Sequence, residues 1–361
     1  MSLVAPAGRS PVSSILVTAA ALVIVIAGMR EAQALLVPFL LAAFIAVIVM
    51  PAVQFMVNHR IPTSVAIFLV ILLILGAGLL LGGLVGRSAD DFSAQLPLYQ
   101  QKFAAMIHGL QVWLSDNGLM LTDETVSRLL DPGRAMAMAA QGLSSLSGLL
   151  TNAFLILLTV LFILFEASGF PAKLRRILPD PASDLRHIER MLNDIKRYMA
   201  IKTLTSLLTG ILIYLALLAL GVDFPLLWGM IAFFLNYVPN IGSLIAAIPP
   251  ILLALVQLGT GAALWTTAIY LLVNNLVGNV IEPRFMGRGL GLSTLVVFVS
   301  LVFWGWVLGL IGMFLSVPLT MTLKIALDSR EDTRWIAILL GPEIGDDEEP
   351  APAPRLPADR T

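Results

Sequence analysis

The sequence contains no cysteine and few charged residues. Without cysteine, the chain cannot form a disulfide, a thiolate metal site or a cysteine nucleophile. Asp, Glu, Lys and Arg make up 12% of the 361 residues, about half the roughly 25% that is typical of soluble globular domains. The histidines His59, His108 and His187 all fall in polar stretches between apolar runs, so an enzyme acting within the membrane is not favoured.

Motifs for cofactor binding are also missing. No Walker or Rossmann pattern occurs, and Gly287-Arg-Gly-Leu-Gly291 has no strand pattern before it. The net charge of -1 gives no indication of nucleic acid binding. We therefore expect no cofactor, no bound metal, no nucleic acid partner and no enzymatic activity.

Long apolar runs dominate the sequence instead. The chain is 58% hydrophobic, with a mean hydropathy of +0.92. Runs of about 20 apolar residues are long enough to cross the hydrocarbon core of a bilayer. We predict an all-α polytopic membrane protein with about eight hydrophobic segments, at residues 12–29, 32–56, 63–86, 147–165, 203–220, 226–258, 262–281 and 294–327.

Residues 87–145 interrupt the apolar pattern and are predicted to form an extramembrane helical insert. Apolar residues recur there in alternating steps of four and three, the spacing of a heptad seam. The helix is expected to end at Asn117-Gly118, and a second segment to begin near Thr122. The seam packs either against a partner subunit or the membrane surface, or against its own protein; its residues are Phe92, Leu96, Tyr99, Phe103, Met106, Leu110 and Trp113.

Three further regions complete the predicted organisation. Residues 1–86 form N-terminal membrane segments, and residues 146–328 form the main membrane region. Within it, the basic segment 169–202 is expected at the cytoplasmic face. Residues 329–361 are acidic and proline-rich, which predicts a largely disordered cytoplasmic tail. The basic segment also contains one apolar helical stripe, typical of an interfacial helix: Leu185, Ile188, Leu192, Ile195 and Met199.

Two apolar segments contain residues that favour a break. The stretch from Asn236 to Pro250 has two asparagines, three prolines and a glycine. Proline removes a backbone donor, and broken backbone at membrane depth is tolerated only where it is buried or lines a watery cavity. Residues 294–327 would span about 50 Å as one helix, well beyond the roughly 30 Å core. We predict hairpins that turn at 236–242 and at 305–312.

The distribution of basic residues supports both hairpins. Arg284 and Arg288 place the loop after residue 281 on the same side as segment 169–202, by the positive-inside rule. The C-terminal region is placed on that side by Lys324, Arg330 and Arg334. Each hairpin must then enter and leave on one face. Both termini are therefore predicted to be cytoplasmic, and the insert to lie outside.

Polar residues beside these breaks are the candidate site. Amides such as those of Asn236 and Asn240 can donate and accept hydrogen bonds. Asn275, Asn279 and Glu282 would share one face of an α-helix, which predicts a cavity lining or a helix contact. The candidates for a solute or ion path are Asn236, Asn240, Asn275, Asn279, Glu282, Arg284 and Asp223.

Two of these candidates also have a structural interpretation. Asp223 alternatively caps a helix, and Glu282 alternatively pairs with Arg284. Other residues are expected to shape the backbone around the path: Pro239, Gly242, Pro249, Pro250, Pro283, Gly287, Gly305, Gly309, Gly312 and Pro318.

Several motifs of the second half occur together in one known family. They are Pro239-Asn-Ile-Gly242, Ile248-Pro-Pro250, Asn279-Val-Ile-Glu-Pro283, Gly287, Leu290-Gly-Leu292, and Gly305 to Gly312 with Pro318. In these motifs, and over about residues 12–327, the sequence resembles the AI-2E family of bacterial membrane transporters, which are autoinducer-2 exporter-like or PerM-type permeases. Ser293 departs from the family pattern, which usually has a proline or histidine-proline after the Gly-Leu segment. The resemblance implies a bacterial inner-membrane protein, a homo-oligomer and secondary transport.

Three functions remain open at this point. The first is a secondary transporter or exporter of a small polar solute, an autoinducer-2-like signal by resemblance. The second is a Na+(Li+)/H+ antiporter of the same family, which would depend on Asp223 or Glu282. The third is a non-transporting oligomeric membrane scaffold assembled through the heptad helix. The expected partners are the lipid bilayer, a small polar solute or cation, and further copies of the chain.

Overall fold

The computed structural model describes residues 11–117, 152–167, 169, 173, 176, 181–239, 241–286, 291–329 and 332–341, and within them every regular element is helical. The N-terminal half contains α1 (Pro11–Glu31), α2 (Gln33–Asn58), α3 (Thr63–Asp116) and α6 (Ala153–Ala167). The remaining elements are α8 (Pro181–Leu220), α9 (Pro225–Leu235), α10 (Ile241–Leu258), α11 (Thr260–Asn274), η1 (Asn275–Ile281), α12 (Glu282–Met286), α13 (Thr294–Asp328) and α14 (Arg334–Leu339).

The apolar helices confirm the predicted class. In the described part of the chain, six helices are long and apolar enough to cross a membrane. They are α2, α3, the part of α8 from Leu192, α10, the run of α11 to Phe285, and α13, while α6 and α9 are shorter apolar helices. The protein is therefore an all-α, polytopic membrane protein.

Two helices are longer than the sequence pattern predicted. The third apolar segment and the first part of the insert form one continuous α3, so the expected division at residues 86 and 87 falls inside a helix, as does His108. Likewise, the basic segment and the apolar segment after Lys202 are joined in α8. Charge ends an apolar run but not a helix, because Asp, Lys and Arg are tolerated on a helix surface. The predicted end of α3 near Asn117 is confirmed.

The first predicted hairpin is confirmed as the pair α9 and α10. The chain leaves α9 in a tight turn, in which the Val238 N–H donates to the Leu235 carbonyl at 2.9 Å. Gly242 then packs so closely that a Cβ there would lie 1.8 Å from the Leu235 oxygen. Pro249 and Pro250 do not break the chain, since both lie inside α10. The break therefore depends on the turn residues and not on this proline pair.

The second predicted hairpin is confirmed within α13. Its backbone departs from helical geometry at Gly309, with φ 68° and ψ -152°, a conformation that favours glycine. The two arms are joined across the bend by the Trp304 indole N–H, which donates to the Thr320 hydroxyl at 3.0 Å. At Gly312, a Cβ would lie 2.0 Å from the Trp304 carbonyl oxygen, so the returning arm also needs a glycine.

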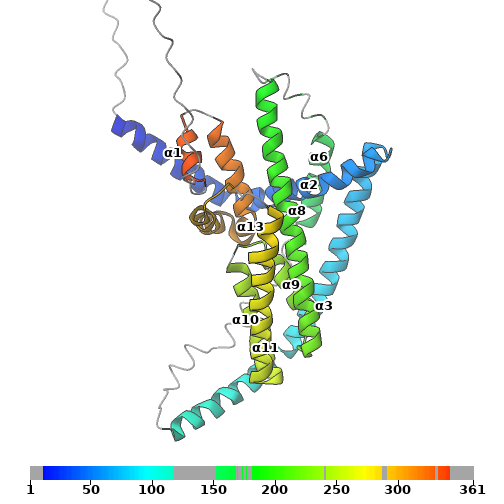
Figure 1. Ribbon diagram of the computed structural model, residues 1–361, viewed down its shortest axis with the longest axis vertical. Coiled ribbons are helices and arrows are strands. Elements are labelled where there is room, and N and C mark those ends of the chain that lie inside the picture. The colour runs from blue at the N-terminus through cyan, green and yellow to red at the C-terminus, as the bar shows by residue number, and fades with distance from the viewer. Residues whose placement is uncertain are drawn as a thin grey trace, which may run out of the picture.

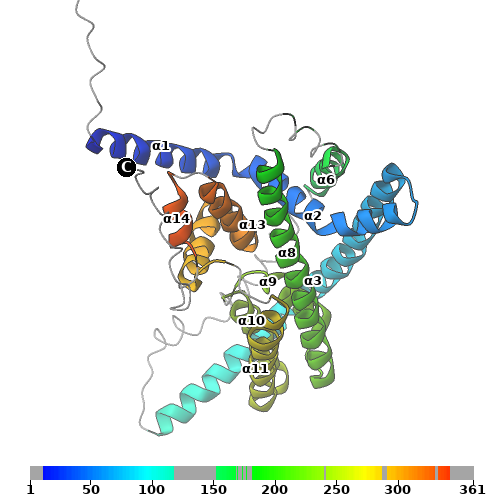
Figure 2. The same ribbon diagram turned by 45° about the horizontal axis from the view of Figure 1, so that its top comes forward.

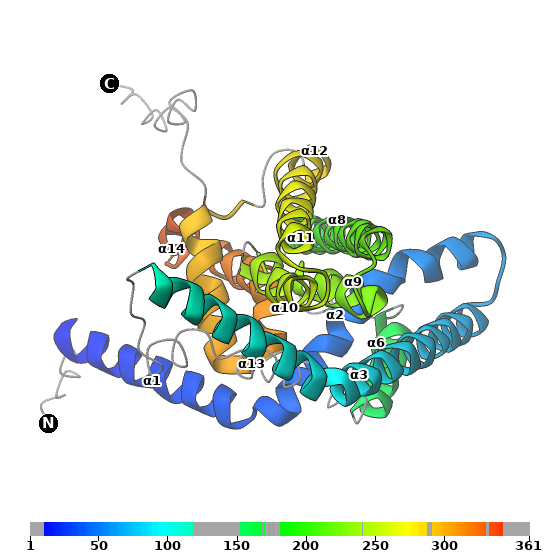
Figure 3. The same ribbon diagram turned by 90° about the horizontal axis from the view of Figure 1, so that it is seen from below.

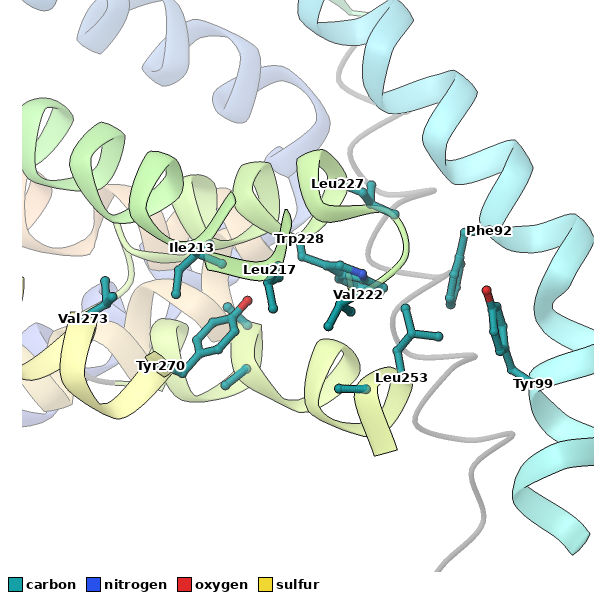
Figure 4. Close-up of a cluster of buried hydrophobic side chains, with 14 of the residues drawn as sticks. Phe92, Tyr99, Ile213, Leu217, Val222, Leu227, Trp228, Leu253, Tyr270 and Val273 are labelled. Carbon is teal, nitrogen blue, oxygen red and sulfur yellow. The ribbon is translucent and has the colours of Figure 1, made fainter. Parts of the chain in front are cut away.

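The largest buried cluster joins α8, α9, α10 and α11, and α3 packs onto it. Phe92 lies edge-on to Trp228 at 5.4 Å and to Phe224 at 5.7 Å between ring centroids. Figure 4 shows Phe92 and Tyr99 of α3 facing this cluster. The first part of the heptad seam therefore packs against its own protein, as one of the two interpretations predicted.

The helices that carry this cluster are arranged side by side. Figures 1 and 3 show α8 and α11 running next to each other, with α9 and α10 beside them. The backbones of α8 and α9 come close where Gly210 faces Gly229, because a Cβ on Gly210 would lie 2.8 Å from the Gly229 oxygen. By contrast, α1 extends away from this group of helices (Figure 2).

Candidate functional site

A buried ion pair links α8 to the start of α12. The Lys202 ammonium lies 2.9 Å and 3.0 Å from the two Glu282 carboxylate oxygens. The two side chains are only 7% and 15% exposed. Burial of opposite charges costs hydration free energy, and in a membrane span such charges usually mark a functional path.

The first hairpin turn is tied to the same face of α8. The Asn236 amide donates to the Ser206 hydroxyl at 3.0 Å. The Tyr237 hydroxyl donates to the Thr203 hydroxyl at 2.8 Å. We define the α8 polar cluster as Lys202, Thr203, Ser206, Asn236, Tyr237 and Glu282. It therefore joins a long helix, a broken hairpin and the helix that follows α11.

That last connection is a π-helix, η1, between α11 and α12. Its geometry corrects the prediction that Asn275, Asn279 and Glu282 share a face. A π-helix turns through a smaller angle per residue than an α-helix, because its bonds run from i to i+5. Residues seven apart therefore lose their alignment, and Glu282 points to α8 while Asn275 and Asn279 are exposed.

The two exposed asparagines form hydrogen bonds along their own helix. The Asn279 amide donates to the Asn275 side-chain oxygen at 2.9 Å, and the Asn275 amide donates to the Leu271 carbonyl at 2.8 Å. These bonds lower the cost of placing amides on an apolar surface. The structure therefore separates Asn275 and Asn279 from Glu282 and from the α8 polar cluster.

The alternative interpretations of Asp223 and Glu282 are both wrong. Glu282 pairs with Lys202 and not with Arg284, whose side chain is exposed. The Asp223 carboxylate accepts a hydrogen bond from the Tyr99 hydroxyl at 2.7 Å. It does not cap α9, because the N-cap position is Phe224, with φ 59° and no side-chain hydrogen bond.

The other predicted site residues are dispersed. Pro239 belongs to the turn, Pro283 is exposed in α12 and Pro318 is buried in α13. Gly305 lies on the first arm of α13, where a Cβ would lie 2.8 Å from the Met313 side chain. Asn240 and Gly287 lie outside the described residues.

A second polar group lies beyond the other end of α8. The Asp223 N–H donates to the Gln257 side-chain oxygen at 2.9 Å, and the Gln257 amide donates to the Gly221 carbonyl at 3.1 Å. From Lys202 to Leu220, α8 rises about 27 Å at 1.5 Å per residue, close to the roughly 30 Å hydrocarbon core. The two polar groups therefore lie about one membrane thickness apart.

Four members of the α8 polar cluster were not predicted from the sequence: Lys202, Thr203, Ser206 and Tyr237. By charge alone, Lys202 belongs with the basic residues of the cytoplasmic segment. A signal was present, however, in the helical stripe that includes Ile195 and Met199. The next steps of three and four reach Lys202 and Ser206, so a charge and a hydroxyl occupy positions where the pattern calls for buried apolar residues.

Broken hairpins, a π-helix and a buried ion pair in a polytopic α-helical protein are the features of a membrane transport protein. The family model for the AI-2E family transporter matches residues 16–331. The chain therefore belongs to the AI-2E transporter family, as its motifs suggested.

Three relatives show how far the similarity extends. The chain is 43% identical to the "AI-2 transport protein TqsA" of Escherichia coli over 319 residues, which are 88% of this chain and 93% of the relative. It is 42% identical to a "Putative transport protein" of Haemophilus influenzae, covering 89% and 94% of the two chains. It is 28% identical to the "Putative permease PerM" of Escherichia coli, covering 67% of each.

Proposed function

We propose that this protein moves a small polar solute of the AI-2 kind across the bacterial inner membrane, by a path through the α8 polar cluster. The Lys202–Glu282 pair is the observation that carries this proposal, because charge is buried beside a π-helix and a broken hairpin. The similarity to TqsA, named as an AI-2 transport protein, supports the solute. Transport would proceed without ATP, by alternating access around the hairpins.

The cluster is suited to alternating access because it joins separate helices by bonds between side chains. Lys202, Thr203 and Ser206 lie on α8, whereas their partners lie on the turn and on α12. A polar solute that bonds to these groups would offset the cost of separating them. The solute then has different affinities for the joined and separated states, as a transport cycle requires.

Cation/proton antiport is a second candidate, and the same ion pair favours it. A Na+ or Li+ ion would compete with the Lys202 ammonium for the Glu282 carboxylate. Flux would then depend on the pH gradient and on Glu282. In both candidates the protein acts by transport and not by catalysis.

Flux measurements distinguish these candidates. The wild type, Glu282→Gln and Lys202→Gln are reconstituted in proteoliposomes, and labelled autoinducer-2 and cation-driven proton fluxes are followed. Each single substitution leaves one buried charge unpaired, which costs about 3–5 kcal/mol. We therefore expect autoinducer-2 flux to fall at least about tenfold in both variants. In the double variant that carries both Glu282→Gln and Lys202→Gln, we expect folding to recover and flux to stay low.

The exposed Lys173–Glu166 pair provides the matched control, because its side chains are 62% and 59% exposed. Glu166→Gln is expected to leave flux unchanged. Wild-type flux in a folded Glu282→Gln variant would contradict the proposed path. Proton flux without autoinducer-2 flux in the wild type would instead support the antiporter.

The arrangement in the membrane also remains a proposal. The Arg197 guanidinium donates to the Phe285 carbonyl at 3.3 Å, which supports the prediction that the basic segment and the loop after η1 lie on one side. We propose that this side and both termini are cytoplasmic, that the insert lies outside, and that the protein assembles with further copies of itself. Cysteine labelling at positions 175 and 286 from the same side, and at position 130 from the other, would test this topology.

A further inference from the structure

Three buried hydroxyls have no hydrogen-bond partner within the part of the chain that the structure describes. They belong to Thr209 of α8 and to Thr266 and Tyr270 of α11. The three residues are 1%, 0% and 2% exposed, respectively. Buried polar atoms are normally paired, and each exception calls for an explanation.

Other hydroxyls in the same helices show that a partner is available. A threonine in a helix can donate to the carbonyl four residues earlier. Thr203 does so to Met199 at 2.7 Å, and Thr267 does so to Ala263 at 2.8 Å. Thr266 is the neighbour of Thr267 but does not use this route. The hydroxyls of Thr209 and Thr266 therefore stay without a partner among the described residues even though their own helices offer backbone acceptors.

The three hydroxyls lie along the packed region that includes α8 and α11. Thr266 and Tyr270 are four residues apart, so they share the buried face of α11. Tyr270 belongs to the same buried cluster as Ile213, and Figure 4 shows it beside Ile213 and Leu217 of α8. Thr209 is one helical turn, about 6 Å, from Ile213. The hydroxyls therefore belong to two adjacent helices and not to scattered parts of the protein.

This line of hydroxyls continues the α8 polar cluster. Lys202, Ser206 and Thr209 follow one another in steps of four and three on one face of α8, and all three are buried. Beyond α8, the polar group of Asp223, Gln257 and Tyr99 lies at the other end. Thr209, Thr266 and Tyr270 therefore lie between two polar groups that are about a membrane thickness apart.

We propose that Thr209, Thr266 and Tyr270 form a binding site between α8 and α11 for a small, neutral solute that bears hydroxyl groups. The proposal rests on the proposed function, because it names further binding residues and the chemical class of the solute. A hydroxyl both donates and accepts, so it can replace the water bonds of another hydroxyl. None of the three carries a charge that would compensate a bound ion, and an unpaired ion at this depth is strongly disfavoured.

The test removes each hydroxyl with little change in shape. Thr209→Val, Thr266→Val and Tyr270→Phe are compared with Thr205→Val and Thr267→Val. The two control hydroxyls are already bonded, to the Lys202 carbonyl at 3.1 Å and to the Ala263 carbonyl at 2.8 Å. The full-length proteins are measured for binding of labelled autoinducer-2, ribose and erythritol by equilibrium dialysis in detergent, and for flux in proteoliposomes.

We expect each of the three variants to weaken binding of at least one probe fivefold or more, and the controls to stay within twofold. The variants should also melt at the same temperature as the unliganded wild type or higher, because an unpaired buried hydroxyl has been removed. The controls should melt lower, because a formed hydrogen bond has been lost.

The outcomes separate this site from the proposed function. Unchanged binding in all three variants, with flux still lost in Glu282→Gln, overturns the site alone. If the wild type binds a probe without transporting it, and Tyr270→Phe abolishes binding, the site stands and the proposed function fails. Absence of probe binding by the wild type overturns the site. The site is also overturned if the three variants lose proton flux but bind the solute probes as the wild type does.

Discussion

The two broken hairpins both need a glycine where their arms approach closely, but they differ in the bonds that their side chains form. In each hairpin, a glycine on the returning arm packs against a backbone carbonyl near the end of the first arm. Gly242 faces the Leu235 oxygen, and Gly312 faces the Trp304 oxygen. Both turns therefore depend on the absence of a Cβ at one position.

The side chains around the two turns differ in what they bond to. The α9–α10 turn bonds outward to α8, through Asn236 and Tyr237. The bend of α13 bonds inward, since Trp304 donates to Thr320 of its own returning arm. A hairpin that bonds to a neighbour can respond to a solute between them, whereas a hairpin closed on itself supplies a rigid frame. We therefore expect changes at the first turn to affect flux, and changes at the second to affect stability.

The largest effect is expected where the two hairpins are alike. Gly242→Val and Gly312→Val place a Cβ within 1.8 Å and 2.0 Å of a backbone oxygen, which a backbone cannot accommodate without moving. Each is expected to cost more than about 3 kcal/mol of folding free energy, and folded protein should be lost. Gel filtration and thermal melting in detergent measure this loss.

Gly76→Ala is the control, because among the described residues nothing beyond its own helix backbone lies within 4 Å of the added Cβ. It is expected to fold normally, since alanine is the better helix former. A stable Gly312→Val protein with wild-type melting would show that the bend of α13 does not need the close approach, and the likeness between the hairpins would then be wrong.

How far the sequence predicted this structure follows from the same comparison. Breaks at 236–242 and 305–312 were predictable because clustered glycine, proline and asparagine act locally on the backbone, and because the last apolar run is too long for one membrane span. The pairing of Lys202 with Glu282 was not, because 80 residues separate the two and charge counting assigned Lys202 to the basic segment at the cytoplasmic face. The π-helix was not predictable either. Asn275, Asn279 and Glu282 have the spacing of one α-helical face, whereas the backbone of η1 has the period of a π-helix.

A smaller effect, on stability alone, is expected at the second hairpin. Thr320→Val removes the acceptor of the Trp304 indole N–H and leaves this donor buried without its partner. An unsatisfied buried donor costs about 1–3 kcal/mol, so the melting temperature should fall. Autoinducer-2 flux per folded protein is expected to stay unchanged. Thr322→Val serves as control, because the Thr322 hydroxyl donates within its own arm, to the Pro318 carbonyl at 2.8 Å.

The smallest effect on stability, and the one that separates the hairpins most clearly, is expected at Asn236. Asn236→Ala removes one hydrogen bond to Ser206 in a partly exposed turn, which costs about 1 kcal/mol. Flux should nevertheless fall at least as much as in Tyr237→Phe, which breaks the neighbouring bond to Thr203. Both turn bonds join the hairpin to α8, so losing either changes the balance between joined and separated states. If Asn236→Ala, like Thr320→Val, lowered the melting temperature but left flux per folded protein unchanged, the two hairpins would have the same structural role. The path would then have to lie elsewhere.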